Sequence, residues 1–310
     1  MKIRKSNEQS KMDDFSPLTT AIQKISDNID GFVYPLIIPP IDQIDEDIIF
    51  NIFDDFNKIG KQDKLHVFLY SYGGDAHSAF LAGKLLQKYS NELKIYILRE
   101  AKSAATLIAA SSNEIVFSDI SELGPLDPQI VHQGLKRRIS PLSIKHALDL
   151  LNSEATNNHE VVVGELAKKL PDPLLLGEYL KSLETSKDYL IKLLSLRMFK
   201  DESSDKIDIK KIAERLVMNY PDHGYCIDYD EANDIGLIVS KIDKKLSTGF
   251  SLVMASFRGM WKTFNMYRLN NDKDKAVQVL IDIGRVRDEV IDYQLNKQKK
   301  NKRRNTKNKK

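Results

Sequence analysis

Ser103 is the residue of this chain whose type and surroundings best fit nucleophilic chemistry. It lies in the segment EAKSAATLIAA, residues 100–110, where small and apolar residues follow the serine. This pattern predicts a buried helix that begins just after Ser103, and serine is a frequent helix N-cap. The hydroxyl group therefore has two interpretations at this point, a capping group or a nucleophile that attacks a carbonyl carbon.

Two glycines upstream of the serine favour the nucleophile. Gly73 and Gly74 stand in the segment SYGGD, and Gly73 precedes Ser103 by 30 residues. Each segment follows a predicted strand, and parallel strands end at the same edge of their sheet, so the two turns are expected side by side. A serine that attacks a carbonyl needs unpaired backbone N–H groups for the oxyanion, and the loss of one donor costs about 3 kcal/mol. Gly73 and Ala104 are placed to supply two such donors.

The elements that must position these turns alternate along the first half of the chain. Segments with the composition of strands alternate with segments of helical periodicity, at 31–38, 46–60, 65–71, 77–90, 93–100, 104–111 and 114–118. This alternation predicts an α/β fold with a mainly parallel sheet between helical layers. From Ser140 to about Met218 the apolar residues follow a helical period, which predicts a helical insertion.

We divide the chain into four parts on this basis. Residues 1–29 form an N-terminal extension, and residues 30–245 form the domain that holds the sheet and the helical insertion. Residues 246–296 form a C-terminal helical extension that ends in an amphipathic helix. Residues 297–310 are a basic tail.

The charge of the chain is unevenly distributed. The formal net charge is +3, but residues 297–310 contain nine Lys and Arg and no acidic residue. The rest of the chain has 38 basic and 44 acidic residues, a net charge of −6. Because a run of like charges repels itself, we expect a disordered tail, which either makes weak contacts with anionic partners or only keeps the chain soluble.

The remaining composition indicates a cytoplasmic protein. The single cysteine, Cys226, excludes an internal disulfide, which suits a reducing compartment. The first residues lack the apolar segment of a secretory signal, and the apolar runs are far shorter than the roughly 20 residues of a spanning helix. We therefore expect no transmembrane segment.

Five segments together resemble one protein family. SYGGD, AKSAATLIAASSNEIVF, SELGPLDPQ, LPDPLLLGE and HGYCIDYDEANDIGL are similar to the serine dehydrogenase proteinase family, of the Clp protease/crotonase fold and related to signal peptide peptidase A. The resemblance covers roughly residues 32–239. It implies a serine peptidase-like hydrolase that cleaves polypeptides, with Ser103 as nucleophile and Gly73 and Ala104 as oxyanion donors, and without a metal or organic cofactor. It also implies a homo-oligomer, and the apolar stripes within residues 154–218, which exceed what the α/β core needs, predict that this region is the docking element.

This chain departs from the family pattern at two positions near the proposed site. Tyr72 stands where the family usually has a proline before the two glycines, and Ala105 stands where it often has glycine. Neither change removes an atom that the chemistry needs.

The general base is left open by the resemblance. The position of the Clp histidine falls in the segment GPLDPQ, which has no histidine but contains Asp127, and the position of the Clp aspartate lies beside His223. The acid and the imidazole would then have exchanged places, which gives the triad Ser103, His223 and Asp127. In the signal peptide peptidase A branch a lysine is the base, and Lys145, which is 42 residues after the serine, is the candidate here.

Simpler interpretations accompany each of these assignments. His223 and Asp127 each lie in a turn and could bond only to the local backbone, and Lys145 could be a solvated helix residue. Two other functions use the same fold. A crotonase-type acyl-CoA enzyme needs the oxyanion donors but no nucleophile, and a scaffold or adaptor needs neither.

Overall fold

The computed structural model describes residues 16–132, 137–157, 159–170, 172–200 and 208–307, and a parallel sheet lies at its centre. The strands are paired in the order β1 (Phe32–Ile37), β2 (Gln62–Ser71), β3 (Ser90–Ala101), β4 (Glu114–Phe117) and β8 (Val239–Lys241). All of these pairings are parallel, and the two-residue strand β5 (Glu122–Leu123) pairs with the end of β3. The predicted α/β fold with a mainly parallel sheet is confirmed.

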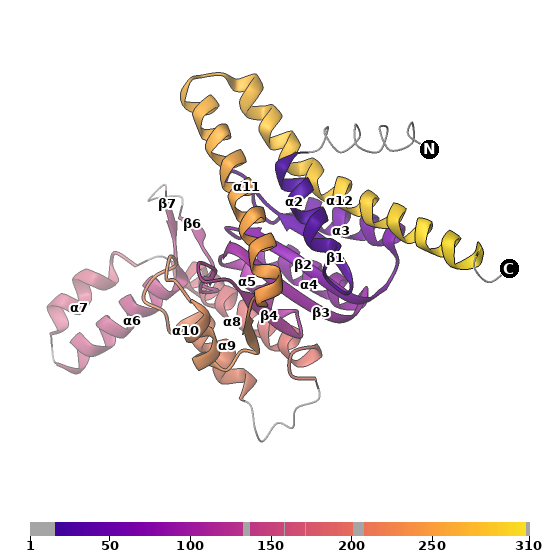
Figure 1. The fold of residues 1–310 in the computed structure, drawn as a ribbon. Coiled ribbons are helices and arrows are strands. Elements are labelled where there is room, and N and C mark those ends of the chain that lie inside the picture. Colours follow the sequence, from indigo (N-terminus) through magenta and orange to yellow (C-terminus); the bar gives the residue numbers. More distant parts are fainter. Residues whose placement is uncertain (1–15, 133–136, 158, 171, 201–207, 308–310) are drawn as a thin grey trace.

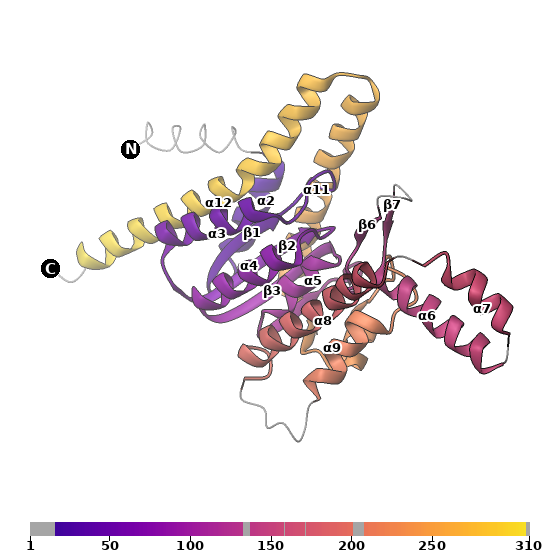
Figure 2. The same cartoon turned by 180° about the vertical axis from the view of Figure 1, so that it is seen from behind.

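Helices cover both faces of the sheet (Figures 1 and 2). One face packs against the helices α3 (Glu46–Ile59), α4 (Ala76–Lys88), α5 (Ala104–Ala110), α8 (Pro173–Leu196), α9 (Ile209–Met218) and α10 (Tyr229–Ile235). The other face packs against α2 (Pro17–Ser26), α11 (Lys244–Leu269) and α12 (Lys273–Lys307). Successive residues of β2 and β3 therefore enter two different cores, as the alternation of side chains along a strand requires.

The predicted helical insertion is present, and a feature that the sequence did not predict lies just before it. An antiparallel pair of strands, β6 (Ile130–His132) and β7 (Arg137–Ile139), precedes it. The helices α6 (Pro141–Thr156) and α7 (Glu160–Ala167) then form a hairpin that projects from the body, at the opposite side from the end of α12 (Figures 1 and 2). The next helices, α8 and α9, return to the core.

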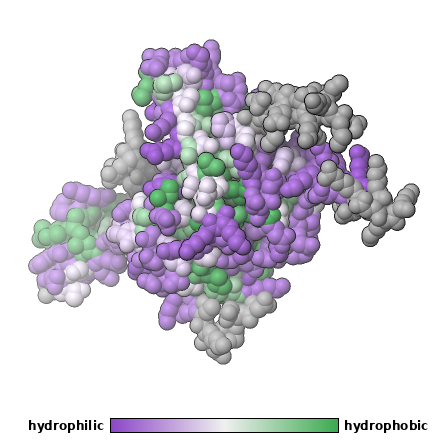
Figure 3. Space-filling view, in the orientation of Figure 1, coloured by the Kyte–Doolittle hydropathy of each residue, from purple (hydrophilic) through white to green (hydrophobic). Residues whose placement is uncertain are grey.

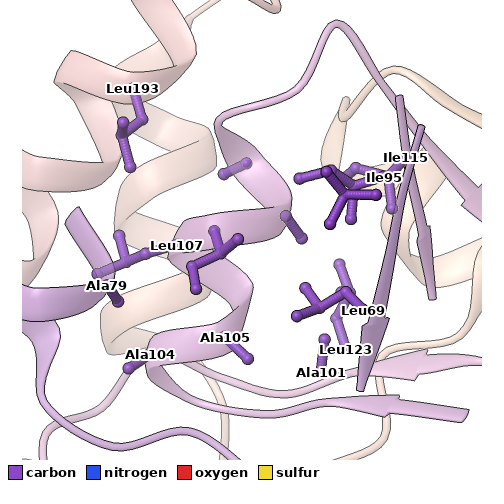
Figure 4. Close-up of a cluster of buried hydrophobic side chains, with 14 of the residues drawn as sticks. Leu69, Ala79, Ile95, Ala101, Ala104, Ala105, Leu107, Ile115, Leu123 and Leu193 are labelled. Carbon is purple, nitrogen blue, oxygen red and sulfur yellow. The ribbon is translucent and has the colours of Figure 1, made fainter. Parts of the chain in front are cut away.

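Helix α5 is buried along its whole length. All seven of its residues are buried, and four of them are alanines. Figure 4 shows Ala104, Ala105 and Leu107 between the sheet residues on one side and Ala79 and Leu193 on the other. Because alanine adds only one carbon to the backbone, α5 can lie close to its neighbours, and the small residues after the serine are explained by this packing.

The basic tail was predicted to be disordered, but most of it is helical. The structure continues α12 through Lys307, so residues 297–307 belong to a helix, while 308–310 lie outside the described residues. The run contains no proline or glycine, and Lys, Arg and Gln are good helix formers. A helix that is already anchored by packing extends into such a run at little cost, because nucleation is the expensive step.

Helix α12 is anchored to the edge of the sheet by one glutamine. The Gln294 amide donates to the Val33 carbonyl at 2.8 Å, and its carbonyl accepts from the Val33 N–H at 2.9 Å. Gln294 is buried, and β1 is an edge strand whose outer backbone groups have no neighbouring strand. The side chain therefore pairs with the backbone N–H and C=O of one edge residue, which would otherwise have no hydrogen-bond partners.

We predict that Gln294→Ala lowers the free energy of unfolding by about 2 kcal/mol, because it leaves a buried donor and acceptor of Val33 unpaired. Gln278→Ala on the same helix is the matched control, since Gln278 is exposed and its side chain bonds to the partly exposed Asp282 on the next turn. It should change the stability by less than about 0.5 kcal/mol. Urea unfolding followed by circular dichroism measures both, and equal stabilities of the two variants would contradict the anchoring role.

Candidate active site

The two turns that the sequence places together are in contact. Strands β2 and β3 end side by side, with Ser71 paired to Ala101. An added Cβ on Gly73 would lie 2.8 Å from the Lys102 carbonyl oxygen and 2.9 Å from the Ser103 Cβ. With a φ of 103°, Gly73 also has a backbone conformation that favours glycine. No other residue fits this position without moving the serine.

The backbone of Ser103 is strained, and its hydroxyl does not cap the helix. Ser103 has a φ of 51° and a ψ of −124°, and it is one of two non-glycine residues with positive φ in the described part of the chain. Its side chain makes no capping hydrogen bond to α5. A capping role therefore does not explain the serine, and strain of this kind is typical of functional positions.

The free backbone donors beside the serine belong to Gly74 and Ala104. The Gly73 N–H, the predicted donor, instead donates to the Ser71 hydroxyl at 3.0 Å. The groups on either side of the Gly74 N–H bond to Ile44: the Gly73 carbonyl accepts from the Ile44 N–H, and the Asp75 N–H donates to the Ile44 carbonyl. Within the described residues the Gly74 N–H itself has no acceptor. The N–H of Ala104, the first residue of α5, has no intrahelical acceptor. The candidate oxyanion donors are thus Gly74 and Ala104.

His223 and Asp127 form a hydrogen-bonded pair. The His223 Nδ1 lies 2.6 Å from the Asp127 Oδ1, and the Gln129 amide donates to the Asp127 Oδ2 at 3.2 Å. The side chain of Asp127 is 3% exposed and that of His223 is 34% exposed. Nδ1 carries the proton that the carboxylate accepts, so the Nε2 of His223 is free to act as a base.

Backbone hydrogen bonds hold the two partners of this pair together. Leu123 and Ile227 exchange both of their backbone bonds, at 2.8 and 3.1 Å. The Leu126 N–H donates to the Leu216 carbonyl at 2.8 Å. These contacts fix the segment of Asp127 against the end of α9 and the turn that carries His223.

Ser103, Ala104, Gly74 and His223 line one cavity of about 430 Å³. Lys145 is not among the described residues that line it, because it is carried by the projecting helix α6 and is partly exposed. The structure therefore brings the predicted serine and histidine to one cavity, with Asp127 behind the histidine, and places the predicted lysine elsewhere.

The cavity contains further polar residues that the sequence analysis did not assign. His77, near the start of α4, lies with its Nδ1 2.8 Å from the Tyr189 hydroxyl of α8, and Tyr189 stacks on Phe80. Ser182, Thr185 and Ser186 of α8 also line the cavity. The sequence signal was present but weak: His77 follows SYGGD closely, whereas the hydroxyls lie more than 75 residues after Ser103.

Lys102, the neighbour of the serine, points away from the cavity into a partly buried ion cluster. Its Nζ lies 2.6 Å from the Glu122 Oε1, and Arg99 approaches the other oxygen of Glu122 at 3.0 Å. Burial acts to raise the pKa of Glu122, but hydrogen bonds from Cys226, Lys102 and Arg99 outweigh it and lower the pKa to about 2. The cluster ties the end of β3 to β5 directly behind the serine turn.

Comparisons with known proteins give distant similarities. No family model matches the chain. It is 24% identical over 179 residues to the uncharacterized protein MJ0137 of Methanocaldococcus jannaschii, a match that covers 58% of this chain and 54% of that protein. The chain thus matches about half the length of this relative.

Two solved structures of the 1510-N membrane-bound stomatin-specific protease are similar in fold. One is a serine-to-alanine variant, with a TM-score of 0.43, 16% identity and coverage of 71% of this chain and 85% of that one. The other is a lysine-to-alanine variant with a substrate peptide, with a TM-score of 0.42, 16% identity and coverage of 71% and 80%. None of the described helices of the present chain is long and apolar enough to cross a membrane.

We predict that Glu122→Gln destabilises the fold in a pH-dependent way. A pKa lowered from 4.5 to about 2 means that ionised Glu122 stabilises the folded chain above pH 4.5 and that this contribution is lost as the pH falls through about 2. The variant should lose about 1–3 kcal/mol at pH 7, and the difference from the wild type should shrink towards pH 2. Thermal unfolding across this range measures it. Glu165→Gln, whose pair with Lys168 is exposed, is the control and should show little loss at any pH.

Proposed function

We propose that this chain is a serine peptidase-like hydrolase that cleaves peptide bonds through an acyl-enzyme on Ser103. The observation that carries the proposal is the strained Ser103, whose hydroxyl makes no capping bond, in one cavity with the Asp127-paired His223 and two free backbone donors. A nucleophile, a base that a third group orients, and an oxyanion site are the parts that acyl transfer requires.

In the proposed reaction each of these groups has one role. The His223 Nε2 accepts the Ser103 proton while Oγ attacks the peptide carbonyl, and the Gly74 and Ala104 N–H groups stabilise the oxyanion. Asp127 holds the proton on Nδ1 and stabilises the imidazolium, which then protonates the departing amine. Water, activated by the same nitrogen, hydrolyses the ester and returns Ser103 to its initial state.

The rival functions account for fewer of these features. A crotonase-type acyl-CoA enzyme would use the backbone donors, but the strained serine and the histidine–aspartate pair would have no role in it. A scaffold or adaptor would not need strain at Ser103. The lysine alternative requires α6 to bring Lys145 to the cavity, whereas His223 already lines it.

We also propose that the chain forms a homo-oligomer. Helix α7 has no buried residue, and Val161 and Leu174 are each 82% exposed. Figure 3 shows apolar residues on this projecting part. The apolar residues of α8 and α9 that face the sheet are buried, so we propose α7 and the start of α8 as the contact within residues 154–218.

We expect a fluorophosphonate probe to label the wild type at Ser103 and not to label Ser103→Ala. His223→Ala should lower the labelling rate at least about 1000-fold, because the serine loses its base. Asp127→Asn should lower it at least about 100-fold, because the amide no longer fixes the imidazole tautomer. Mass spectrometry of the labelled peptide identifies the modified residue, and labelling reactions stopped at timed intervals give the rates.

Lys145→Ala serves as the matched comparison for these variants. It should label at a rate within about threefold of the wild type, since α6 carries the lysine outside the cavity. A normal rate for His223→Ala together with a large loss for Lys145→Ala would replace the histidine by the lysine as base. Labelling that survives Ser103→Ala would overturn the hydrolase.

Light scattering at micromolar concentration should give a mass well above 35.4 kDa, the mass of one chain. Val161→Glu should lower this mass, because a charge at the proposed contact must be buried on assembly. Leu252→Glu, at an exposed residue of α11, should leave it unchanged. A wild type that scatters as a single chain would refute the assembly.

A further inference from the structure

A second cavity opens at the same edge of the sheet, on the opposite face from Ser103. It has a volume of about 610 Å³, within the usual range for ligand sites. Its floor comes from the ends of β2 and β3 and the segment after β4, and its roof comes from α11. The C-terminal extension therefore builds one wall of it.

Tyr72 joins the two cavities. Its side chain is 47% exposed and lines both the Ser103 cavity and the α11 cavity. Tyr72 precedes Gly74 by two residues, which places their Cα atoms at most about 7 Å apart. An extended peptide advances about 3.3 Å per residue, so a peptide held at Gly74 reaches Tyr72 within a few residues.

Five of the fourteen residues that line the α11 cavity are aromatic. Tyr70 packs on Phe257 with ring centroids 4.5 Å apart and on Tyr72 at 5.9 Å. Trp261 and Met254 of α11 complete the apolar wall. Its four charged residues are two arginines and two acids, so their formal charges cancel. Arg258 and Asp119 are exposed, and Arg99 pairs with both Glu122 at 3.0 Å and Glu100 at 3.6 Å. The cavity therefore favours a large uncharged side chain, which gains free energy from leaving water and packing on the rings.

We propose that the α11 cavity is the specificity pocket of the enzyme and binds a large apolar or aromatic side chain of the substrate polypeptide, a few residues from the scissile bond. This inference rests on the proposed function: Tyr72 lines both cavities, so a polypeptide bound at Ser103 is the molecule whose side chain can enter the α11 cavity. Substrates with phenylalanine at the selected position are bound in preference to those with alanine. Selectivity is thus set by the C-terminal extension, on the face of the sheet away from the nucleophile.

Trp261 provides a direct test, because it is the only tryptophan of the chain and lines the cavity. The Ser103→Ala protein, which should not turn substrate over, is titrated with a peptide set in which a single phenylalanine moves through successive positions of an alanine-rich sequence. Trp261 emission is followed throughout. One position should bind at least about tenfold more tightly than the all-alanine peptide, with a change in emission.

Two phenylalanine substitutions on α11 separate the cavity from the rest of the helix. Ala255→Phe places bulk in the cavity, and Leu252→Phe places the same ring at an exposed residue that does not line it. In the Ser103→Ala background, the first should reduce the preference to less than about twofold and the second should keep it. Thermal unfolding of both variants shows that they fold.

The outcomes distinguish this proposal from the proposed function. Equal binding of all peptides, or a preference that survives Ala255→Phe in a folded protein, overturns the specificity pocket even if Ser103 is labelled. A wild type that the fluorophosphonate does not label overturns the hydrolase, while the Trp261 titration, which needs no turnover, still decides whether the cavity binds such side chains.

Discussion

The close approach of two turns at the edge of the sheet is the constraint on which the site depends. An added Cβ on Gly73 would lie 2.8 Å from the Lys102 carbonyl oxygen and 2.9 Å from the Ser103 Cβ, and one on Gly74 would overlap the backbone of Ile44. Parallel pairing of β2 with β3 brings the turns to this distance, and two consecutive glycines allow it.

Much of this arrangement follows from sequence because it has local causes. Strands buried on both faces are continuous apolar runs, so their alternation with helices was sufficient to predict the parallel sheet. The pairing of Asp127 with His223 joins residues 96 positions apart, and no local pattern contains it. It was predicted only through the family resemblance, from the hypothesis that an acid and an imidazole had exchanged positions.

Other features depend on contacts that a single sequence does not record. Two adjacent glycines look equivalent in SYGG, and only the bond from Gly73 to Ser71 shows that Gly74 has the free N–H. The helical state of residues 297–307 depends on the anchoring of α12, whereas charge alone favoured disorder. The second cavity combines two strand ends with a helix more than 120 residues further along the chain, a separation at which periodicity carries no information.

The anchoring of β1 by Gln294 has a consequence for the order in which the chain folds. These residues are 261 positions apart, so at a synthesis rate of about 5–20 residues per second the ribosome adds Gln294 about 13–50 seconds after Val33. During this interval the outer edge of the sheet has no cover and can pair with strands of other nascent chains. A chaperone that shields exposed strands would be needed most in that window, before the last helix emerges and closes the edge.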